Sequence, residues 1–469
     1  MKNMPPPSNV AICRGCSNYS NRDEVKALVL QAIETLGLAE HFILAGDHIV
    51  IKPNWVKEHD ERFPQPGNWE HVIAHPGVIE TVAGWAASRL NGVGKITICD
   101  APQTDSSFEK IREYCKLDEM LKRLQDEHPQ ITFALLDLRP EEWHAVDGIT
   151  VSKKELPGDP LGSTHIHLDQ ASEFYQYKGL GKLFGASVDV EETNRKHGKG
   201  NHEYLLCRTP MDADVFINIP KLKTHKKVGV TCALKNLVGI NANKNWLPHH
   251  TEGTPDQGGD QFPLSTTKAK LEHSWMGAAK RWIKKYPFLA RFFVPLKQAG
   301  RLVFGDTQKV VRSGNWHGND TCWRMVLDLN KSFFHFNGAA EPRSKPLRYL
   351  VVVDGIVGGE GNGPMSPDAV QTGVIIAGTH PLTVDCAAAR CVGFDWNRIR
   401  LLRNAFQIKH LNFVNFKEED MTWQSSVAEQ PQPLRELEPF FYYKAHFGWV
   451  GAIELPPPLG TAAQQKPDK

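Results

Sequence analysis

The sequence lacks most of the features that mark secreted and membrane-spanning proteins. Nine cysteines are scattered over 469 residues without a pattern of pairs, which is atypical of a secreted disulfide framework. No stretch approaches the roughly 18 apolar residues of a spanning helix, and the first residues hold no apolar run that could serve as a signal peptide. These absences predict a cytoplasmic protein.

Several catalytic signatures are missing as well. There is no Gly-x-Ser-x-Gly elbow, and no Gly-Lys-Ser or Gly-Lys-Thr of a P-loop, so the sequence gives no sign of a serine hydrolase or a P-loop nucleotidase. The formal net charge is only +2, and 41% hydrophobic and 23% charged residues are ordinary for a globular protein. The length suits two or three domains, or one large domain with insertions.

Apolar runs and amphipathic patterns alternate along much of the chain. Seven runs have the length and branching of strands: residues 10–13, 48–51, 94–99, 131–138, 215–219, 347–353 and 372–377. Helices are predicted between or after several of them, including residues 24–36 and 382–392. This alternation predicts an α/β fold with a largely parallel sheet and helices on both faces.

The composition divides the chain into four parts. We expect the first part of the α/β core at residues 1–240 and the second at residues 321–415. Residues 241–320 are expected to form a loop and a basic amphipathic helical insertion. Residues 416–469 are polar and rich in proline, and we expect a C-terminal extension that is partly disordered.

The predicted insertion contains a segment of unusual composition. Residues 264–304 hold nine lysines or arginines and a single acid, Glu272, interleaved with aromatic residues. This pattern is typical of a helix that lies on an anionic membrane surface, here the inner face of the membrane. The alternative is an insertion that packs its aromatic side chains on the core. Nucleic-acid binding is not expected, because the flanking stretches carry no further basic clusters.

Residues 214–239, DVFINIPKLKTHKKVGVTCALKNLVG, carry the densest group of candidate site residues. Lys221, Lys223 and His225 alternate, so they point the same way if the chain there is extended. A short predicted helix follows and carries Thr231, Lys235 and Asn236. Lysines beside helix N-terminal amides predict a site for a phosphate or carboxylate. The alternative is a solvated basic loop.

Polar residues also follow other predicted strands, where an open α/β sheet places its ligands. These residues are Lys52 and Asn54, Asp100, Asp354 and Glu360, and His380 and Asp385. We expect them to share one cleft with the central lysines. Residues 354–363 read as a glycine-rich turn, in which Gly359 and Gly361 would let the backbone approach a ligand.

The side chains suggest catalytic roles. His225 or His380 could move a proton, and Lys223 could hold an anion. Asp354, Glu360 and Asp385 could serve as a base or, with a histidine, hold a divalent metal.

Metal ligands are the least specific prediction. The candidates are Cys13, Cys16, His225 and Asp354. A lone Cys-x-x-Cys pair supplies too few ligands for an iron–sulfur cluster, so a divalent metal is the better expectation. His165, His167 and Asp169 also alternate as on a strand, which fits either a metal trio or an exposed polar strand face.

The central stretch also resembles the domain-of-unknown-function family 362. The shared motifs are NIPKLKTH with ALKNLVGI, IKPNW at 51–55, DGIVGGEGNGP at 354–364 and GTHPLTVDCAAARCVGFD at 378–395. They keep the family's order and span most of residues 8–415. GNWHGNDTCWRMVLDLN, at 314–330, is similar to a branch found among bacterial polysaccharide genes. Many relatives carry a ferredoxin-like iron–sulfur module, which this sequence lacks.

Three functions follow from these observations. The first is an enzyme that acts on an anionic metabolite or, as the resemblance implies, on a lipid-linked sugar intermediate of surface polysaccharide assembly. The second is a metal- or iron–sulfur-linked oxidoreductase or isomerase. The third is a non-catalytic module that binds an anionic ligand at a membrane surface.

Overall fold

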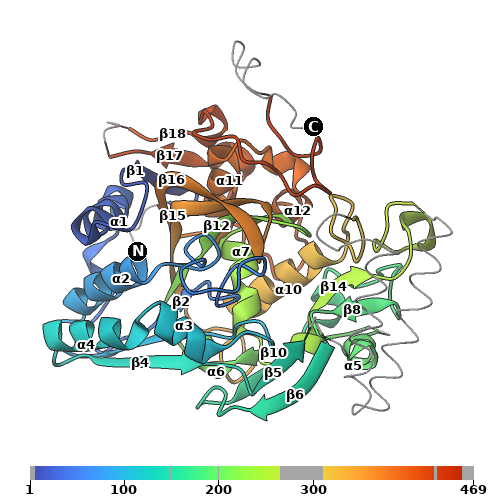
Figure 1. Ribbon diagram of the computed structural model, residues 1–469, viewed down its shortest axis with the longest axis horizontal. Coiled ribbons are helices and arrows are strands. Elements are labelled where there is room, and N and C mark those ends of the chain that lie inside the picture. The colour runs from blue at the N-terminus through green and yellow to red at the C-terminus, as the bar shows by residue number, and fades with distance from the viewer. Residues whose placement is uncertain are drawn as a thin grey trace.

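The computed structural model describes residues 6–146, 149–187, 189–198, 200–264, 310–426 and 430–456 (Figure 1). The expected basic insertion at 264–304 lies outside these residues apart from Leu264, and so does the end of the C-terminal extension. Within the described part of the chain, no helix is both long and apolar enough to cross a membrane.

A mixed sheet of eleven strands forms the centre of the α/β fold (Figure 1). Five neighbouring strands are parallel to one another: β15 (Arg348–Asn362), β11 (Val215–Ile219), β2 (His48–Pro53), β3 (Lys95–Asp100) and β4 (Thr132–Asp137). Because these strands run the same way, their carboxyl ends meet at one edge of the sheet. The predicted largely parallel sheet is therefore confirmed.

The other part of the sheet is mainly antiparallel and joins the two ends of the chain. β16 (Ser366–Gly378) lies antiparallel between β15 and β1 (Asn9–Arg14). β17 (Thr422–Gln424) pairs parallel with β1, and β18 (Gln432–Pro433) forms the edge. Part of the C-terminal extension thus continues the sheet.

One element differs clearly from its sequence-based prediction. The glycine-rich stretch at 354–363 is not a turn, because β15 continues through it to Asn362 and pairs with β16 along its length. The ladder is irregular between Gly355 and Val357. Glycine suits this stretch because other segments of the same chain pass very close to it. A Cβ at Gly363, for example, would overlap the backbone of Thr224.

Strand residues alternate between two hydrophobic clusters. In β2, Ile49 and Ile51 belong to one cluster and Val50 to the other. The first cluster includes residues of α1 (Arg22–Leu36), α2 (Pro76–Arg89), α3 (Phe108–Tyr114) and α4 (Leu117–Glu127). The second includes residues of α10 (Cys322–His335), α11 (Pro381–Cys391) and α12 (Arg400–Ala405).

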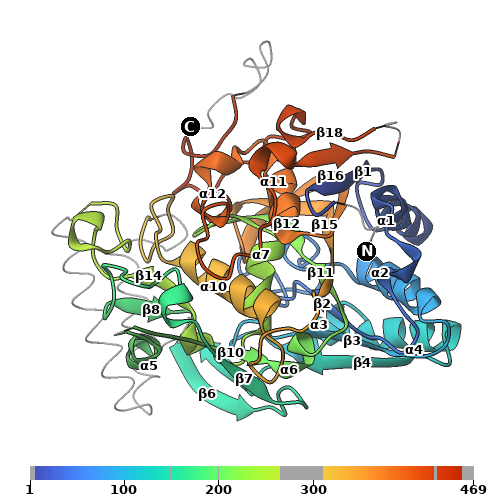
Figure 2. The ribbon, with the colours of Figure 1, turned by 180° about the vertical axis from the view of Figure 1, so that it is seen from behind.

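The middle of the chain forms smaller sheets beside α10 (Figure 2). β7 (Ser163–His167), β10 (Asn201–Cys207) and β9 (His197–Gly198) form one sheet. β5 (Glu141–Val146) pairs with β6 (Ile149–Glu155), and β14 (Pro248–Thr251) with β8 (Leu183–Gly185). Short helices α5 (Val190–Lys196) and α6 (Arg208–Met211) flank these strands. Short 3₁₀ helices, labelled η, also occur: η1 (Glu40–Phe42), η2 (Asp169–Ala171), η5 (Pro255–Gln257), η7 (Trp396–Arg398), η8 (Glu418–Asp420) and η9 (Leu434–Glu436).

Candidate functional site

A pocket of about 290 Å³ lies where β2 and β3 end and the central motif begins. We call it the lysine pocket because six lysines line it: Lys52, Lys223, Lys226, Lys227, Lys235 and Lys244. Among the described residues that line it, the only carboxylate is Asp100. The strand-end rule thus brings Lys52, Asn54 and Asp100 together with the central motif.

The central motif reaches the lysine pocket through three short elements. β12 (Lys221–His225) follows Pro220 and pairs with β15 and with β13 (Gly229–Thr231). α7 (Ala233–Asn236) comes next and continues into η3 (Leu237–Ile240). Lys223, His225, Thr231, Lys235 and Asn236 all line the pocket, as expected from their spacing. The Thr231 hydroxyl is buried there without a hydrogen-bond partner among the described residues.

Asp385 fixes the start of α7. Its two carboxylate oxygens accept hydrogen bonds from the backbone N–H groups of Ala233 (2.6 Å) and Leu234 (3.0 Å). Burial raises the pKa of Asp385 to about 7. These two amides are therefore bonded within the protein, and the predicted use of helix N-terminal amides for an anion is not supported. Asp385 instead positions α7, which carries Lys235.

One lysine of the pocket has its charge balanced. Lys52 Nζ lies 2.8 Å from Asp100 Oδ1 and donates to Asn236 Oδ1 at 3.0 Å. Asn54 donates to the same Asn236 oxygen at 3.0 Å, and Asp100 Oδ2 accepts the Trp55 N–H at 2.7 Å. Burial lowers the pKa of Lys52, and the Asp100 carboxylate opposes that shift. This network fixes the side chains of Lys52, Asn54 and Asp100 where they line the pocket.

Among the described residues, no other ammonium group of the pocket forms an ion pair with a carboxylate, although the charges of Glu61 and Asp260 act on Lys226 and Lys227. Lys244 donates to the carbonyls of Ala101 (3.0 Å) and Val238 (2.9 Å), and Lys223 donates to the Val72 carbonyl. Carbonyl groups carry no net charge, so these contacts do not neutralise the two lysines. Lys235 is buried, and no described group lies within hydrogen-bond or ion-pair distance of its ammonium.

Burial shifts the proton affinity of these lysines. It lowers the pKa of Lys227 and of Lys244 to about 8. Burial, together with the nearby charges of Lys221 and Lys235, holds the pKa of Lys223 well below its usual range. Lys227 and Lys244 therefore lose their protons near pH 8, and an anion that comes close favours their protonated forms.

The His225 ring is neutral, and its hydrogen bonding determines which ring nitrogen carries the proton. Burial, reinforced by the charge of Lys235, keeps its pKa well below the ordinary range. Its Nδ1 accepts the backbone N–H of Lys227 at 3.0 Å. The ring proton of the neutral form must then reside on Nε2, so His225 can donate a hydrogen bond from that atom.

Lys221 does not line the pocket, although it precedes Lys223 by two residues. The pairing of β12 with β15 jumps from Lys221–Asp354 to Lys223–Gly359, and this irregularity separates the two lysine heads. Lys221 Nζ instead lies 2.6 Å from Asp354, which also accepts the Tyr19 hydroxyl at 2.6 Å. The predicted shared cleft therefore excludes both Lys221 and Asp354.

The remaining predicted residues also lie outside the pocket lining. Glu360 accepts the backbone N–H of Lys444 at 2.8 Å. His380 begins α11, where its Nδ1 accepts the Leu382 N–H, and its Nε2 lies 3.1 Å from the Phe413 carbonyl. Gly359 and Gly361 are ladder positions of β15.

Several lining residues were missed by sequence reasoning. They are Lys226, Lys227, Lys244, His249 and His250. The pair at 226–227 directly follows His225, so its place in a basic run was the available signal. Lys244 belongs to η4 (Lys244–Trp246), which the sequence presents only as part of a polar loop.

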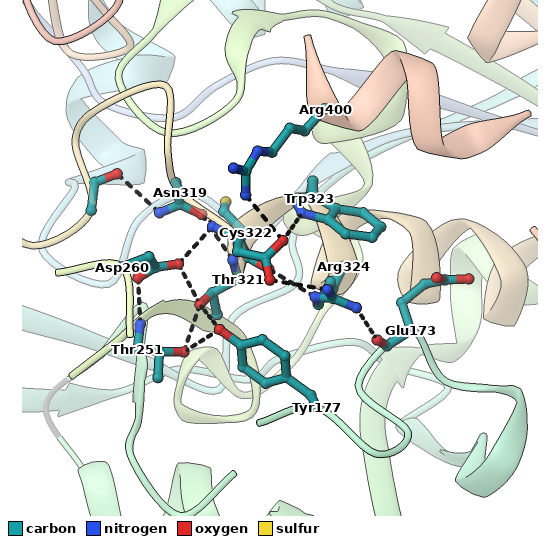
Figure 3. A network of polar contacts seen from close by, with 12 residues as sticks. Glu173, Tyr177, Thr251, Asp260, Asn319, Thr321, Cys322, Trp323, Arg324 and Arg400 are labelled. Carbon is teal, nitrogen blue, oxygen red and sulfur yellow. Dashed lines mark hydrogen bonds and ion pairs between the residues drawn. The ribbon is translucent and has the colours of Figure 1, made fainter. Parts of the chain in front are cut away.

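A polar network connects residues 249–260 to the start of α10 (Figure 3). Asp260 accepts hydrogen bonds from Thr251 N (2.7 Å), Thr321 Oγ1 (2.6 Å) and Asp320 N (2.8 Å). Asn319 donates to the His249 carbonyl at 3.0 Å and accepts the Cys322 N–H at 2.8 Å. These bonds hold one wall of the lysine pocket against α10.

The predicted metal ligands are not brought together. Cys13 and Cys16 are free thiols, and burial raises the pKa of each. His225 lines the lysine pocket, whereas Asp354 is paired with Lys221. In the described part of the chain, the one group of three metal-type side chains is His165, His167 and Glu203.

Comparison with known proteins identifies a family. The model of the family described as "Domain of unknown function (DUF362)" matches residues 163–390. This range contains the central motif and most residues that line the lysine pocket. No curated protein matches the chain significantly.

Proposed function

We propose that this chain, whose residues 163–390 belong to the DUF362 family, is an enzyme whose lysine pocket binds a small molecule carrying phosphate or carboxylate groups. The observation that carries this proposal is the excess of basic side chains in one pocket: six lysines against one carboxylate, which is itself paired with Lys52. Like charges repel, and a pair about 4 Å apart interacts by about 4 kcal/mol at an effective dielectric constant of 20. An anion would relieve that repulsion.

Roles within the pocket follow from the partners of each side chain. Lys235 has an ammonium without a partner among the described residues and supplies the first contact for an anionic group. Lys244 and Lys227, held by carbonyls, add fixed positive charge. The unpartnered Thr231 hydroxyl is a further donor. A ligand with two or more negative charges uses this arrangement best.

Lys223 and His225 are the proposed proton-transfer groups. Burial lowers the pKa of Lys223, which favours the neutral amine that would accept a proton from the bound molecule. His225 presents an N–H at Nε2 that can stabilise negative charge developing on an oxygen. The competing function, a binding module without chemistry, needs the lysines but neither of these two groups.

Calorimetric titration with pyrophosphate tests the proposal. The Lys235→Met variant should bind at least about tenfold more weakly than the wild type, because it loses a desolvated charge contact worth more than about 1.4 kcal/mol. Lys26→Gln, a change at an exposed lysine of α1, is the matched control and should bind normally. Equal affinity in the wild type and Lys235→Met would refute the pocket as the binding site.

Proton uptake gives a second readout. At pH 8, near the pKa of about 8 of Lys227 and Lys244, an entering anion raises these pKa values and the complex takes up protons. Titrations in two buffers of different ionisation enthalpy measure that uptake. Binding without any uptake would contradict an anion held by buried, partly deprotonated lysines.

The finer proposal is that the ligand is a lipid-linked sugar intermediate of polysaccharide assembly, met at the inner membrane face. It rests on the resemblance of residues 314–330 to the polysaccharide-associated branch, and Asn319 of this stretch bonds the His249 carbonyl beside the pocket. Tighter binding of farnesyl phosphate than of inorganic phosphate would support a lipid-bearing ligand. Equal binding would contradict it. The oxidoreductase alternative instead predicts a metal or a visible absorption band in protein purified without oxygen.

A further inference from the structure

We infer that His165, His167 and Glu203 form a binding site for a single divalent transition-metal ion of the zinc class. The ligand atoms of these three side chains lie within 4.8 Å of one another. Two imidazole nitrogens and a carboxylate oxygen are ligands that Zn²⁺ accepts, and three protein ligands leave a fourth position for water or a small ligand. The site is independent of the lysine pocket and of the function proposed for it.

Strand geometry explains why the three side chains converge. β7 alternates exposed and buried residues, and His165 and His167 are on its exposed face. β10 lies antiparallel to β7, and Glu203 is directly opposite His167 in the register. The Cβ atoms of residues directly opposite each other on paired strands are about 5 Å apart. Side chains two positions apart on one strand project in the same direction. The sequence pattern supplied both histidines but named Asp169 as the third ligand, whereas the partner comes from across the ladder.

The spacing is suitable for a metal after small side-chain rotations. Zinc binds imidazole nitrogen at about 2.0–2.1 Å, which puts tetrahedral ligand atoms roughly 3.4 Å apart. His165 Nδ1 already lies 3.8 Å from Glu203 Oε2. The His165 side chain is 50% exposed, so its ring has room to turn.

Neighbouring groups hold the carboxylate and compete with a metal ion. Lys196 Nζ lies 2.7 Å from Glu203 Oε2, and Asn201 donates to Glu203 Oε1. A bound dication would repel Lys196. That ammonium also lies 4.0 Å from the centre of the Trp246 ring, which offers it a second favourable position. Trp246 packs edge-on against His165 and limits the directions in which that imidazole can turn.

The test is calorimetric titration of the full-length, tag-free protein with ZnCl₂. Wild-type protein should bind a single Zn²⁺, and His167→Asn and Glu203→Gln should each weaken binding by at least about tenfold, because each removes one of three ligands. Lys196→Met should strengthen binding, because it removes the competing cation. A merely structural role of Lys196 would not give that increase. His144→Asn, at an exposed histidine of β5, is the matched control and should leave binding unchanged.

Cobalt substitution separates this site from the nine cysteines. Co²⁺ at a site of nitrogen and oxygen ligands gives visible bands without the near-ultraviolet charge-transfer band of a thiolate ligand. Circular dichroism shows that each variant is folded before it is titrated. Absence of zinc binding, a thiolate band, or equal affinities in wild type, His167→Asn and Glu203→Gln would each overturn the inference.

Discussion

The Lys221 ammonium lies 2.6 Å from an Asp354 carboxylate oxygen, and neither side chain is exposed to solvent. The Tyr19 hydroxyl donates to the same carboxylate at 2.6 Å and accepts from Lys221 at 2.8 Å. The backbone N–H of His75 adds a further bond to Asp354 at 2.8 Å. Burial lowers the pKa of Lys221, and Asp354 opposes that shift. The pair thus connects β12, β15 and the N-terminal segment within the core.

Removing one partner of this pair should be costly. Asp354→Asn leaves a buried ammonium without a countercharge, and we expect the free energy of unfolding to fall by about 3–5 kcal/mol. The matched control is Asp118→Asn, which breaks the exposed Arg112–Asp118 pair, also 2.6 Å long, and should cost less than about 1 kcal/mol. Urea denaturation measures both. Similar losses in the two variants would show that burial does not make the Lys221 pair special.

His380 should make stability depend on acidity. Burial lowers its pKa from 6.5 to about 4, so the unfolded chain binds a proton more readily than the folded one between these values. The contribution of His380 to stability is therefore complete above about pH 6.5 and declines as the pH falls toward 4. His380→Asn keeps a capping oxygen for α11 but does not titrate. Its stability relative to the wild type should improve as the pH falls from 7 to 5. A constant difference over that range would contradict the shift.

The fold could be predicted largely because apolar runs and helical periods are local signals. The expected strands at 48–51 and 215–219 and the expected helix at 24–36 are present as β2, β11 and α1. The glycine-rich stretch at 354–363 was assigned wrongly, because many glycines indicate a turn when no neighbour is known. In the structure these glycines are required because other segments of the same chain pack closely against β15.

The candidate site was predictable in its centre and not at its edges. Lys223 and Lys235 follow from spacing within one short motif. Asp385 was expected in the cleft, but its carboxylate is used by the backbone of α7, which is a tertiary contact across about 150 residues that no local pattern reports. Glu203 was missed as a partner of His167 for the same reason, since it lies opposite on another strand.

Replacing Lys235 should stabilise the fold and, at the same time, weaken anion binding. The Lys235 side chain is buried, its ammonium has no partner within hydrogen-bond or ion-pair distance among the described residues, and burial lowers its pKa. We expect Lys235→Met to raise the free energy of unfolding by about 0.5–2 kcal/mol in the absence of anions. Thermal melting in a buffer free of phosphate and sulfate measures this effect. A destabilised Lys235→Met protein would indicate that the charge has a partner and is not held for a ligand.

Cys16 should be the most readily alkylated thiol among the described cysteines. It is half-buried, whereas the other eight are buried. Burial, together with the charge of Glu24, raises its pKa, so little thiolate is present at pH 7.5. Iodoacetamide should label Cys16 first, more slowly than free cysteine, and faster as the pH rises. Mass spectrometry of wild type and Cys16→Ser identifies the site. Labelling that begins at Cys13 would contradict the burial seen here.

Gly239 offers a test of the lysine pocket that changes no charge. A Cβ at this position would overlap Asp100 Oδ1 and the end of the Lys52 side chain. Neither group can move freely, because Asp100 is also bonded to Trp55 and Lys52 to Asn236. The Gly239 carbonyl accepts the Ala101 N–H at 2.7 Å, which holds the backbone as well. We therefore expect Gly239→Ala to lower the free energy of unfolding by about 1–3 kcal/mol.

Gly239→Ala should also weaken pyrophosphate binding even though every lysine remains, because it displaces the Lys52–Asp100 ion pair that lines the pocket. Gly84→Ala is the matched control. Its Cβ would meet only side-chain atoms of His128 and Leu124 at 3.8 Å, and alanine is the better helix former within α2. That variant should be as stable as the wild type or slightly more stable, with unchanged binding. If Gly239→Ala retained both stability and affinity, the Lys52–Asp100 pair would not shape the site, and binding would depend on net charge alone.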